Sequence, residues 1–193
     1  MNLEKRSFNN KIKVVILVAL SVVLMQFRIG IPIFPSFLDF DLSDIPIFFI
    51  GLTFSPILSV VAMGLKNILI LFVMGSFTFG VGEVANFLMG SSFVFVASYV
   101  FHKSHTKKYV LSFLSGMVSL VLVSIILNYF VILPVYAKVL GVTIGNIIGE
   151  GNSILKFLVV TIVSYNVLKS ILIFLPTIPI YNKYQKINSR RNS

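Results

Sequence analysis

Hydrogen-bonding side chains stand at a few positions inside stretches of the chain that are otherwise almost wholly apolar. Asn166 and Lys169 are three residues apart, so on a helix they lie on one face. Asn128 stands in a second apolar stretch, and Asn67 and Asn86 stand near the starts of two others. Amide and ammonium groups bind ligands through hydrogen bonds. The pattern favours a ligand pocket assembled from several stretches.

Residue sets for catalysis are missing from the sequence. It contains no phosphate-binding motif of the Gly-x-x-x-x-Gly-Lys-[Ser/Thr] type, no Ser/His/Asp set and no paired carboxylates. There is no cysteine, and His102 and His105 have no carboxylate or thiol nearby to complete a metal site. We therefore expect a protein that is not an enzyme, holds no metal or other cofactor, and cannot hydrolyse ATP by itself.

The elements that position the polar residues must lie in a membrane. Of the 193 residues, 57% are hydrophobic and only 11% are charged, whereas soluble domains carry about 25% charged residues. So little polar surface cannot cover a soluble globule, and lipid has to cover part of it. We expect an all-α integral membrane protein that forms one helical bundle.

Apolar runs that approach the length of a membrane crossing predict six transmembrane helices. The third run is short, so five helices are an alternative. The second run ends at Met63 and the third begins at Leu65, which places a break at residue 64. The six ranges are 13–27, 45–63, 65–74, 81–101, 109–133 and 154–178.

Charge placement favours six spans with both termini in the cytoplasm. The net charge is +10, and eleven of the sixteen Lys and Arg residues fall in the two termini and the 102–108 loop. This is the positive-inside distribution of a multi-pass protein of the cell membrane, so we expect no nucleic-acid partner. Five of the six acids fall in segments that would then lie outside: Asp39, Asp41, Asp44, Glu83 and Glu150.

The same pattern predicts the domain organisation. Residues 1–12 form a cytoplasmic segment, 13–180 the substrate-binding membrane domain, and 181–193 a basic cytoplasmic tail whose end, 188–193, we expect to be disordered. The N-terminus could pass for a secretory signal peptide. However, no cleavage site precedes a polar region, so we expect a retained first span.

Several polar positions have a purely structural alternative. Asn67 and Asn86 could join helices through interhelical hydrogen bonds, and Lys66 could extend to the cytoplasmic interface. Lys169 favours a ligand, because helix packing does not require a charge at that depth.

The 34–46 connection is rich in Phe, Pro and Asp. We expect it to form a lid over an outward-facing cavity, with an ordinary extracellular loop as the alternative.

Five sequence blocks, in order over residues 13–180, resemble the riboflavin-binding S component of energy-coupling factor (ECF) transporters. The resemblance implies a six-helix bundle that binds riboflavin from outside. It also implies three protein partners, namely a transmembrane coupling subunit and two ATPase subunits. The blocks are FLDFDLSDIP (37–46), LKN (65–67), VGEVANFLMG (81–90), LNYFVILPVY (127–136) and YNVLK (165–169).

The resemblance also implies roles for individual residues. Asn128, Asn166 and Lys169 match positions that contact the flavin in the family, and the first connecting loop, up to Asp44, helps to close the pocket. Asn67 and Asn86 are candidates for the ribityl hydroxyls.

The first helix departs from the family pattern at the partner surface. Family members pack paired small residues, four apart, against the coupling subunit, but here Ala19 is followed four residues later by Val23. Close helix crossings prefer small residues. Either the valine is tolerated at this contact, or the contact shifts.

Other functions stay open at this point. The same fold could serve another vitamin or a nucleobase-like compound, because a fold does not determine its ligand. A membrane scaffold without transport activity is a second alternative. An enzyme that acts on a lipid is a third, although no acid–base pair supports it.

Overall fold

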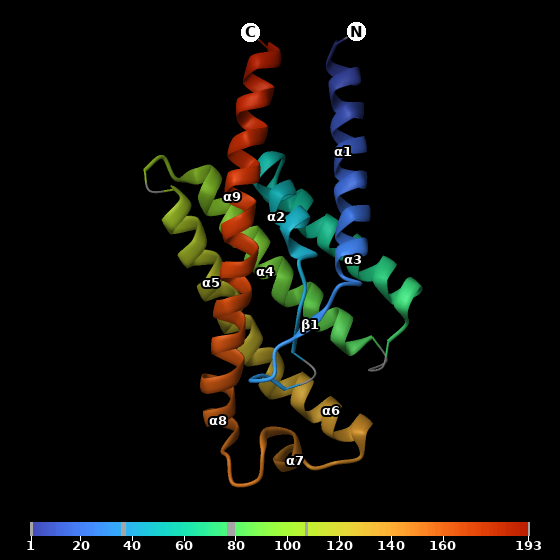
Figure 1. Cartoon of the computed structure of the whole chain (residues 1–193), viewed down its shortest axis with the longest axis vertical. Coiled ribbons are helices and arrows are strands. Elements are labelled where there is room, and N and C mark those ends of the chain that lie inside the picture. The colour runs from blue at the N-terminus through green and yellow to red at the C-terminus, as the bar shows by residue number, and fades with distance from the viewer. Residues whose placement is uncertain (1, 36–37, 77–79, 107, 193) are drawn as a thin grey trace.

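The computed structural model describes residues 2–35, 38–76, 80–106 and 108–192, with side chains described between Phe8 and Arg190 within these ranges. Most of the chain is helical, and a small antiparallel hairpin joins the first two helices (Figure 1). The segments η1 and η2 are π-helical. The elements are α1 (Asn2–Leu24), β1 (Ile29–Gly30), β2 (Asp39–Phe40), α2 (Asp44–Thr53), α3 (Pro56–Met74), α4 (Val81–Lys103), α5 (Lys108–Leu127), η1 (Asn128–Ile132), α6 (Leu133–Leu140), α7 (Ile144–Ile148), α8 (Ile154–Phe157), η2 (Leu158–Val163) and α9 (Ser164–Asn192).

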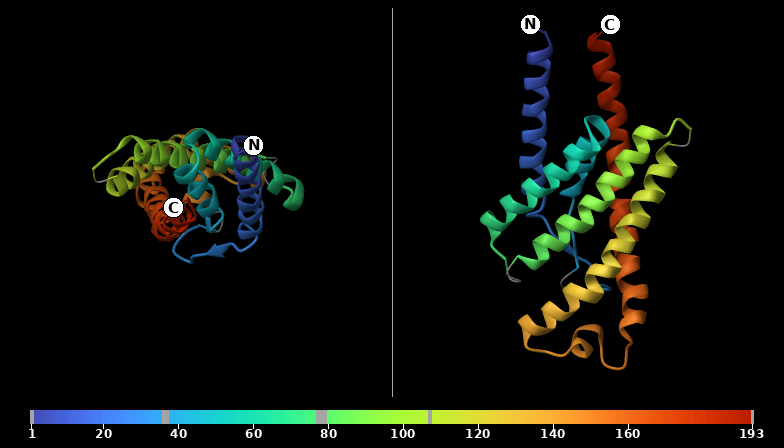
Figure 2. Two further views of the ribbon diagram at one scale, coloured as in Figure 1. Left: turned by 90° about the horizontal axis from the view of Figure 1, so that it is seen from above. Right: turned by 180° about the vertical axis from the view of Figure 1, so that it is seen from behind.

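Among the described residues, four helical stretches are long and apolar enough to cross a membrane. They are Pro56–Met74, Val81–Lys103, Lys108–Leu140 and Ile154–Arg190, and the apolar helix α2 is shorter, with 10 residues. Together with α1 these helices form a single bundle (Figures 1 and 2). The predicted helical membrane fold is confirmed.

The predicted break at residue 64, between the second and third spans, is wrong. α2 ends at Thr53, and α3 begins at Pro56 and continues through Gly64 to Met74. Proline lacks an N–H and has a fixed φ, so it suits the first turn of a helix, where that donor would have no partner. Gly64 lies beside the ring of Phe87, where an added Cβ would be 3.4 Å from Cε2. The boundary therefore follows the proline.

The expected disorder at the end of the chain is wrong for the residues described, because α9 is helical as far as Asn192. The ring of Tyr184 packs edge-on against Phe49 with 5.4 Å between centroids, and its hydroxyl accepts a hydrogen bond of 3.2 Å from Lys13 Nζ. Once a helix is anchored, each further turn forms at little cost. α9 also contains Pro176 and Pro179, so proline does not end this helix.

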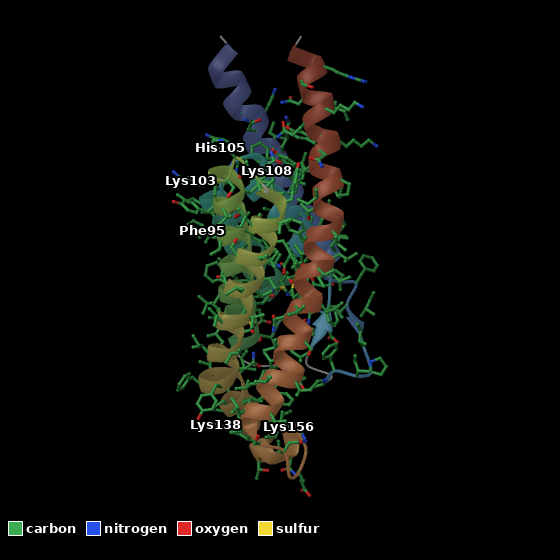
Figure 3. The ribbon with its side chains drawn as sticks, turned by 90° about the vertical axis from the view of Figure 1, so that its left-hand side faces the viewer. Phe95, Lys103, His105, Lys108, Lys138 and Lys156 are labelled. Atoms are coloured by element: carbon green, nitrogen blue, oxygen red, sulfur yellow. The ribbon has the colours of Figure 1, made fainter. Side chains whose placement is uncertain are left out.

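The two ends of the bundle differ in what they carry. Both termini lie at one end, and α6 and α7 lie at the other (Figures 1 and 2). Lys103, His105 and Lys108 lie toward the end with the termini, whereas Lys138 and Lys156 lie toward the opposite end (Figure 3). Lys107, which belongs to the predicted basic loop, is outside the described residues.

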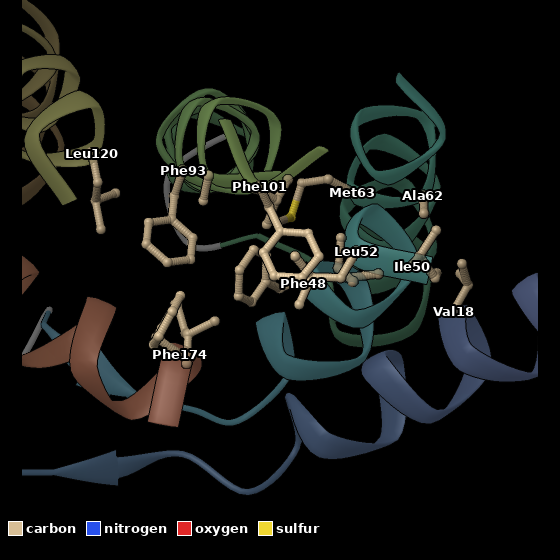
Figure 4. Close-up of a cluster of buried hydrophobic side chains, with 14 residues drawn as sticks. Val18, Phe48, Ile50, Leu52, Ala62, Met63, Phe93, Phe101, Leu120 and Phe174 are labelled. Carbon is tan, nitrogen blue, oxygen red and sulfur yellow. The ribbon is translucent and has the colours of Figure 1, made fainter. Parts of the chain in front are cut away.

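The main hydrophobic core surrounds α2, which packs against α1, α3, α4 and α9. Phe48 of α2 is fully buried, and its ring lies 5.3 Å from that of Phe93 and 5.8 Å from that of Phe174 (Figure 4). Gly116 lets α5 approach α4, since a Cβ there would come within 2.7 Å of Ala97 Cβ. This packing fixes the positions of α4 and α9, which carry polar residues of the candidate site.

Candidate ligand-binding site

A cavity of about 210 Å³ lies between the α1–α2 connection (residues 25–43), α4, the η1–α6 stretch and α9. Its wall combines apolar, aromatic, amide and charged side chains, as ligand pockets commonly do. The residues that line it are Met25, Arg28, Leu38, Asp39, Asp41, Gly82, Glu83, Ala85, Asn86, Met89, Asn128, Ile132, Tyr136, Tyr165, Asn166 and Lys169.

Four of the six predicted ligand residues line this single cavity. Asn128 comes from η1, Asn166 and Lys169 come from α9, and Asn86 comes from α4. All except Asn86 are more than nine-tenths buried. Asp44 and Asn67 are not part of the wall but lie directly behind it, as the next contacts show.

Asp44 is a buried counter-ion for two lysines. Its Oδ1 lies 2.5 Å from Lys66 Nζ, and its Oδ2 lies 3.2 Å from Lys169 Nζ. Lys66 also donates a 3.0 Å hydrogen bond to Ser43 Oγ. Among the described side chains, two positive charges thus share one carboxylate beside the cavity. Asp39, Asp41 and Glu83 add further carboxylates to the wall on which Lys169 lies.

Two acid and base positions are more buried than their sequence context suggested. Asp44, assigned from the sequence to an outer segment, is 1% exposed and begins α2. Lys66 was a candidate for the cytoplasmic interface, yet it is fully buried. The reason is mutual neutralisation, because a carboxylate and an ammonium in contact lower the cost of burying each other.

An amide chain extends this cluster across α4 to α3. Lys169 Nζ donates to Asn86 Oδ1 at 3.4 Å, and Asn86 Nδ2 donates to Asn67 Oδ1 at 3.0 Å. Asn67 Nδ2 in turn donates to the carbonyl of Met63 at 2.8 Å. Asn67 therefore uses both ends of its amide within the protein, which is the interhelical role weighed as its alternative.

Asn128 and Asn166 each accompany a π-helical segment. Asn128 begins η1, and Asn166 lies one turn after the end of η2. Such segments are rare and often occur at functional sites. Each amide donates a 2.8 Å hydrogen bond to the carbonyl four residues earlier in the chain. Asn128 Nδ2 donates to Ser124, and Asn166 Nδ2 donates to Ile162. Asn128 Oδ1 is left buried without a hydrogen-bond partner among the described residues.

The connection between α1 and α2 lines one side of this cavity and is tied to α9. β1 pairs with β2 in the register Ile29 with Phe40 and Gly30 with Asp39. The hydroxyl of Tyr165 donates to the carbonyl of Asp39 at 2.7 Å, and its ring lies 4.5 Å from that of Phe40. Residues 36–37 of the expected lid are outside the described residues, but Leu38, Asp39 and Asp41 form part of the wall.

The sequence as a whole matches one protein family. The model of the ECF transporter substrate-specific component matches residues 11–181. The chain belongs to this family. It is therefore a transport protein of the membrane and not an enzyme, and as an S component it works with an ECF energizing module.

Relatives of this S component have similar lengths. It is 32% identical to the riboflavin transporter RibU of Staphylococcus aureus (strain TCH60) over 174 residues, which cover 89% of this chain and 88% of the relative. It is 32% identical to the riboflavin transporter FmnP of Bacillus subtilis (strain 168) over 158 residues, 80% of each chain.

A solved structure has the same fold as this S component. That structure, described as the S component of a bacterial ECF transporter, has a TM-score of 0.76 and 28% sequence identity. The match covers 94% of this chain and 98% of the other.

Several wall residues of this S component were not singled out from the sequence. Arg28 directly follows the first predicted span and was given no role, and Tyr136 lay in a block in which only Asn128 was singled out. Glu83 was assigned to an outer segment only; its Oε2 accepts a 2.8 Å hydrogen bond from Ser76 Oγ. The spacing of Glu83 and Asn86, three apart on α4, was the available signal that both face one side.

The expected partner surface on α1 is open in the isolated S component. Ala19 is exposed, and Val23 is 54% exposed. The apolar residues on either side of this pair, Val15, Ile16, Leu20 and Phe27, are exposed as well. α1 thus presents a continuous apolar surface outside the bundle.

Proposed function

We propose that this S component captures riboflavin in the cavity beside the α1–α2 connection and delivers it inward for ATP-driven import. The observation that carries the proposal is the convergence of Asn128, Asn166 and Lys169 on one cavity. The names of the Staphylococcus aureus and Bacillus subtilis relatives, both riboflavin transporters, support the same ligand.

The hydrogen-bonding groups of the wall suit the edge of an isoalloxazine ring. That edge carries two carbonyl acceptors on either side of a ring N–H donor. Lys169 would donate to a carbonyl, and the unpaired Asn128 Oδ1 would accept from the N–H. A buried group without a partner costs about 1–3 kcal/mol, so a ligand that pairs with Asn128 recovers that cost.

The rest of the wall suits the remainder of riboflavin. The apolar side chains of Leu38, Met89 and Ile132 and the ring of Tyr165 would enclose the flat faces of the ring system. Arg28, Asp39, Glu83 and Asn86 would serve the ribityl hydroxyls. Asp44 and Asn67 would act from behind the wall, where Asp44 holds Lys169 and Asn67 holds Asn86.

The proposed orientation places both termini in the cytoplasm of a plasma-membrane protein. Lys103 and Lys108 lie toward the end with the termini (Figure 3), and basic residues collect on the cytoplasmic side of membrane proteins. The α1–α2 connection would then act as a lid toward the outside, so that riboflavin enters from there.

The proposed energizing module consists of a transmembrane coupling subunit and two ATPases. The exposed apolar surface of α1, which includes Ala19 and Val23, is the proposed contact with the coupling subunit. Val23 is larger than the small residue expected there, so helix crossing at this point would be less close.

A titration of the purified protein in detergent with riboflavin tests the ligand. Flavin fluorescence should be quenched in a saturable way at one riboflavin per chain, and excess thiamine or biotin should not reverse the quenching. If riboflavin shows no saturable binding while another vitamin does, the S-component role stands and the proposed ligand is wrong. Retention of no vitamin at all would favour the scaffold alternative.

A further inference from the structure

Among the side chains that the structure describes, basic residues and no Asp or Glu lie at the end of the bundle that carries the termini. Of the acids whose side chains are described, Asp39, Asp41 and Glu83 line the cavity, Asp44 is buried behind it, and Glu150 lies between α7 and α8. The basic side chains described at the terminal end are Lys11, Lys13, Lys103, Lys108, Lys183, Lys186 and Arg190. This end therefore favours an anionic partner.

A second cavity, of about 270 Å³, lies directly below this basic end, between α5 and α9. Its wall is apolar and its rim is open, since Val110, Leu114 and Leu175 are 56%, 45% and 65% exposed. It is lined also by Phe113, Ile171 and Phe174. In a membrane protein such a groove faces hydrocarbon, and α5 lies on the other side of the bundle from α1 (Figure 2).

Both helices that form this groove carry a lysine near its upper end, Lys108 on α5 and Lys186 on α9. Tyr109 closes that end, and its hydroxyl donates to Asn182 Oδ1 at 2.9 Å, which joins α5 to α9. Lys108 Nζ is held 5.4 Å from the Tyr109 ring and 4.8 Å from the Phe101 ring. Lys186 follows Asn182 by four residues, so it lies one turn further along the same face of α9.

We propose that the α5–α9 groove and the lysines above it form a binding site for one anionic phospholipid. An acyl chain fills the groove, and the phosphate lies between Lys108 and Lys186. Basic pockets between transmembrane helices bind acidic headgroups in this way. The combination of an apolar groove with a cationic rim distinguishes a phospholipid from free phosphate, which would not need the groove, and from a neutral lipid, which would not need the lysines.

Native mass spectrometry of the purified full-length protein tests the site with two probes, phosphatidylglycerol and phosphatidylcholine of identical chains. The wild type should retain one phosphatidylglycerol more strongly than phosphatidylcholine. The double variant Lys108→Ala/Lys186→Ala should lose retention by about tenfold or more, since each basic residue near the surface contributes to binding acidic lipid. Leu114→Trp places a bulky side chain in the groove and should reduce the retention of phosphatidylglycerol to a similar extent.

The matched control is Lys138→Ala/Lys156→Ala, which removes two exposed lysines at the opposite end (Figure 3) and should leave retention unchanged. Circular dichroism and gel filtration show whether each variant is folded. Equal retention of the two lipids, or an equal loss in the control variant, would overturn the proposal. The proposal would also be overturned if the double lysine variant lost phosphatidylglycerol but Leu114→Trp did not. In that case electrostatic attraction of the headgroup alone would explain the retention, without an acyl chain in the groove. Displacement of the lipid by glycerol phosphate alone would identify a phosphate site instead.

Discussion

Lys169 Nζ lies 3.2 Å from Asp44 Oδ2, and Lys66 Nζ lies 2.5 Å from the other oxygen of the same carboxylate. The lysine on the cavity wall is therefore held from behind by an acid that starts a different helix. This relationship ties the geometry of the proposed riboflavin site to the packing of α2, α3 and α9.

Asp44→Asn should destabilise the protein by about 3–5 kcal/mol, because it leaves two buried ammonium groups without a counter-ion. Thermal unfolding in detergent, followed by circular dichroism, measures the loss. Glu150→Gln, at an exposed position, is the control and should have little effect. Adding Lys66→Met to Asp44→Asn should recover part of the stability. An unchanged unfolding temperature in Asp44→Asn would contradict the charge argument.

Asn128→Ala and Lys169→Ala should each weaken riboflavin binding by about 1–3 kcal/mol, because each removes a partner from a buried hydrogen-bonding edge. Titration by flavin fluorescence measures the affinity. Asn188→Ala, in the terminal part of α9, is the control. Unchanged affinity in both variants would reject the assignment of these residues even if the protein binds riboflavin elsewhere.

Tyr165→Phe should accelerate riboflavin release. The substitution removes the 2.7 Å hydrogen bond to the Asp39 carbonyl but keeps the ring contacts with Phe34 and Phe40. A bond of this kind contributes about 0.5–1.5 kcal/mol, which corresponds to a rate increase of roughly 2- to 13-fold if the lid opens before release. Stopped-flow release of bound riboflavin measures it. Tyr129→Phe, at an exposed position outside the wall, should release riboflavin at the wild-type rate.

Val23→Trp should reduce co-purification with the coupling subunit while riboflavin affinity stays the same, because a bulky side chain separates two helices that must approach closely. Leu122→Trp on α5, equally exposed at 56% against 54% for Val23, is the control. Normal assembly of the Val23→Trp variant would exclude this part of α1 from the contact.

Single cysteines should report the orientation, since the chain has none of its own. Ser104→Cys and Ser189→Cys should react with a membrane-impermeant maleimide only after cell lysis, and Asn152→Cys, between α7 and α8, should react in intact cells. Labelling in the reverse pattern would invert the proposed topology and with it the side from which riboflavin enters.

The class of fold and three principal wall residues could be predicted from the sequence, because both depend on which side chains lose favourable contact with water. Apolar runs identify helices in lipid, and an amide or ammonium group inside such a run needs a compensating partner. Asn128, Asn166 and Lys169 were found on that basis and by resemblance, and the structure brings them to one cavity.

Other features depend on contacts between distant segments, which a single sequence does not display. The pairing of Asp44 with Lys66 and Lys169 joins three helices, so Asp44 looked like a loop acid and Lys66 like an interface charge. The break before Pro56 was missed because hydropathy continues across it, and the helical end of α9 depends on Tyr184 packing against Phe49.

Two prolines inside α9 weaken this helix between the candidate cavity and the terminal end of the bundle. Pro176 and Pro179 cannot donate to the carbonyls of Leu172 and Leu175, so two rungs of the helical hydrogen-bond ladder are missing above Lys169. Beyond these prolines the basic end is held by contacts of its own, the packing of Tyr184 against Phe49 and the hydrogen bond from Tyr109 to Asn182. One continuous helix thus carries both part of the wall of the candidate cavity and the basic end of the bundle.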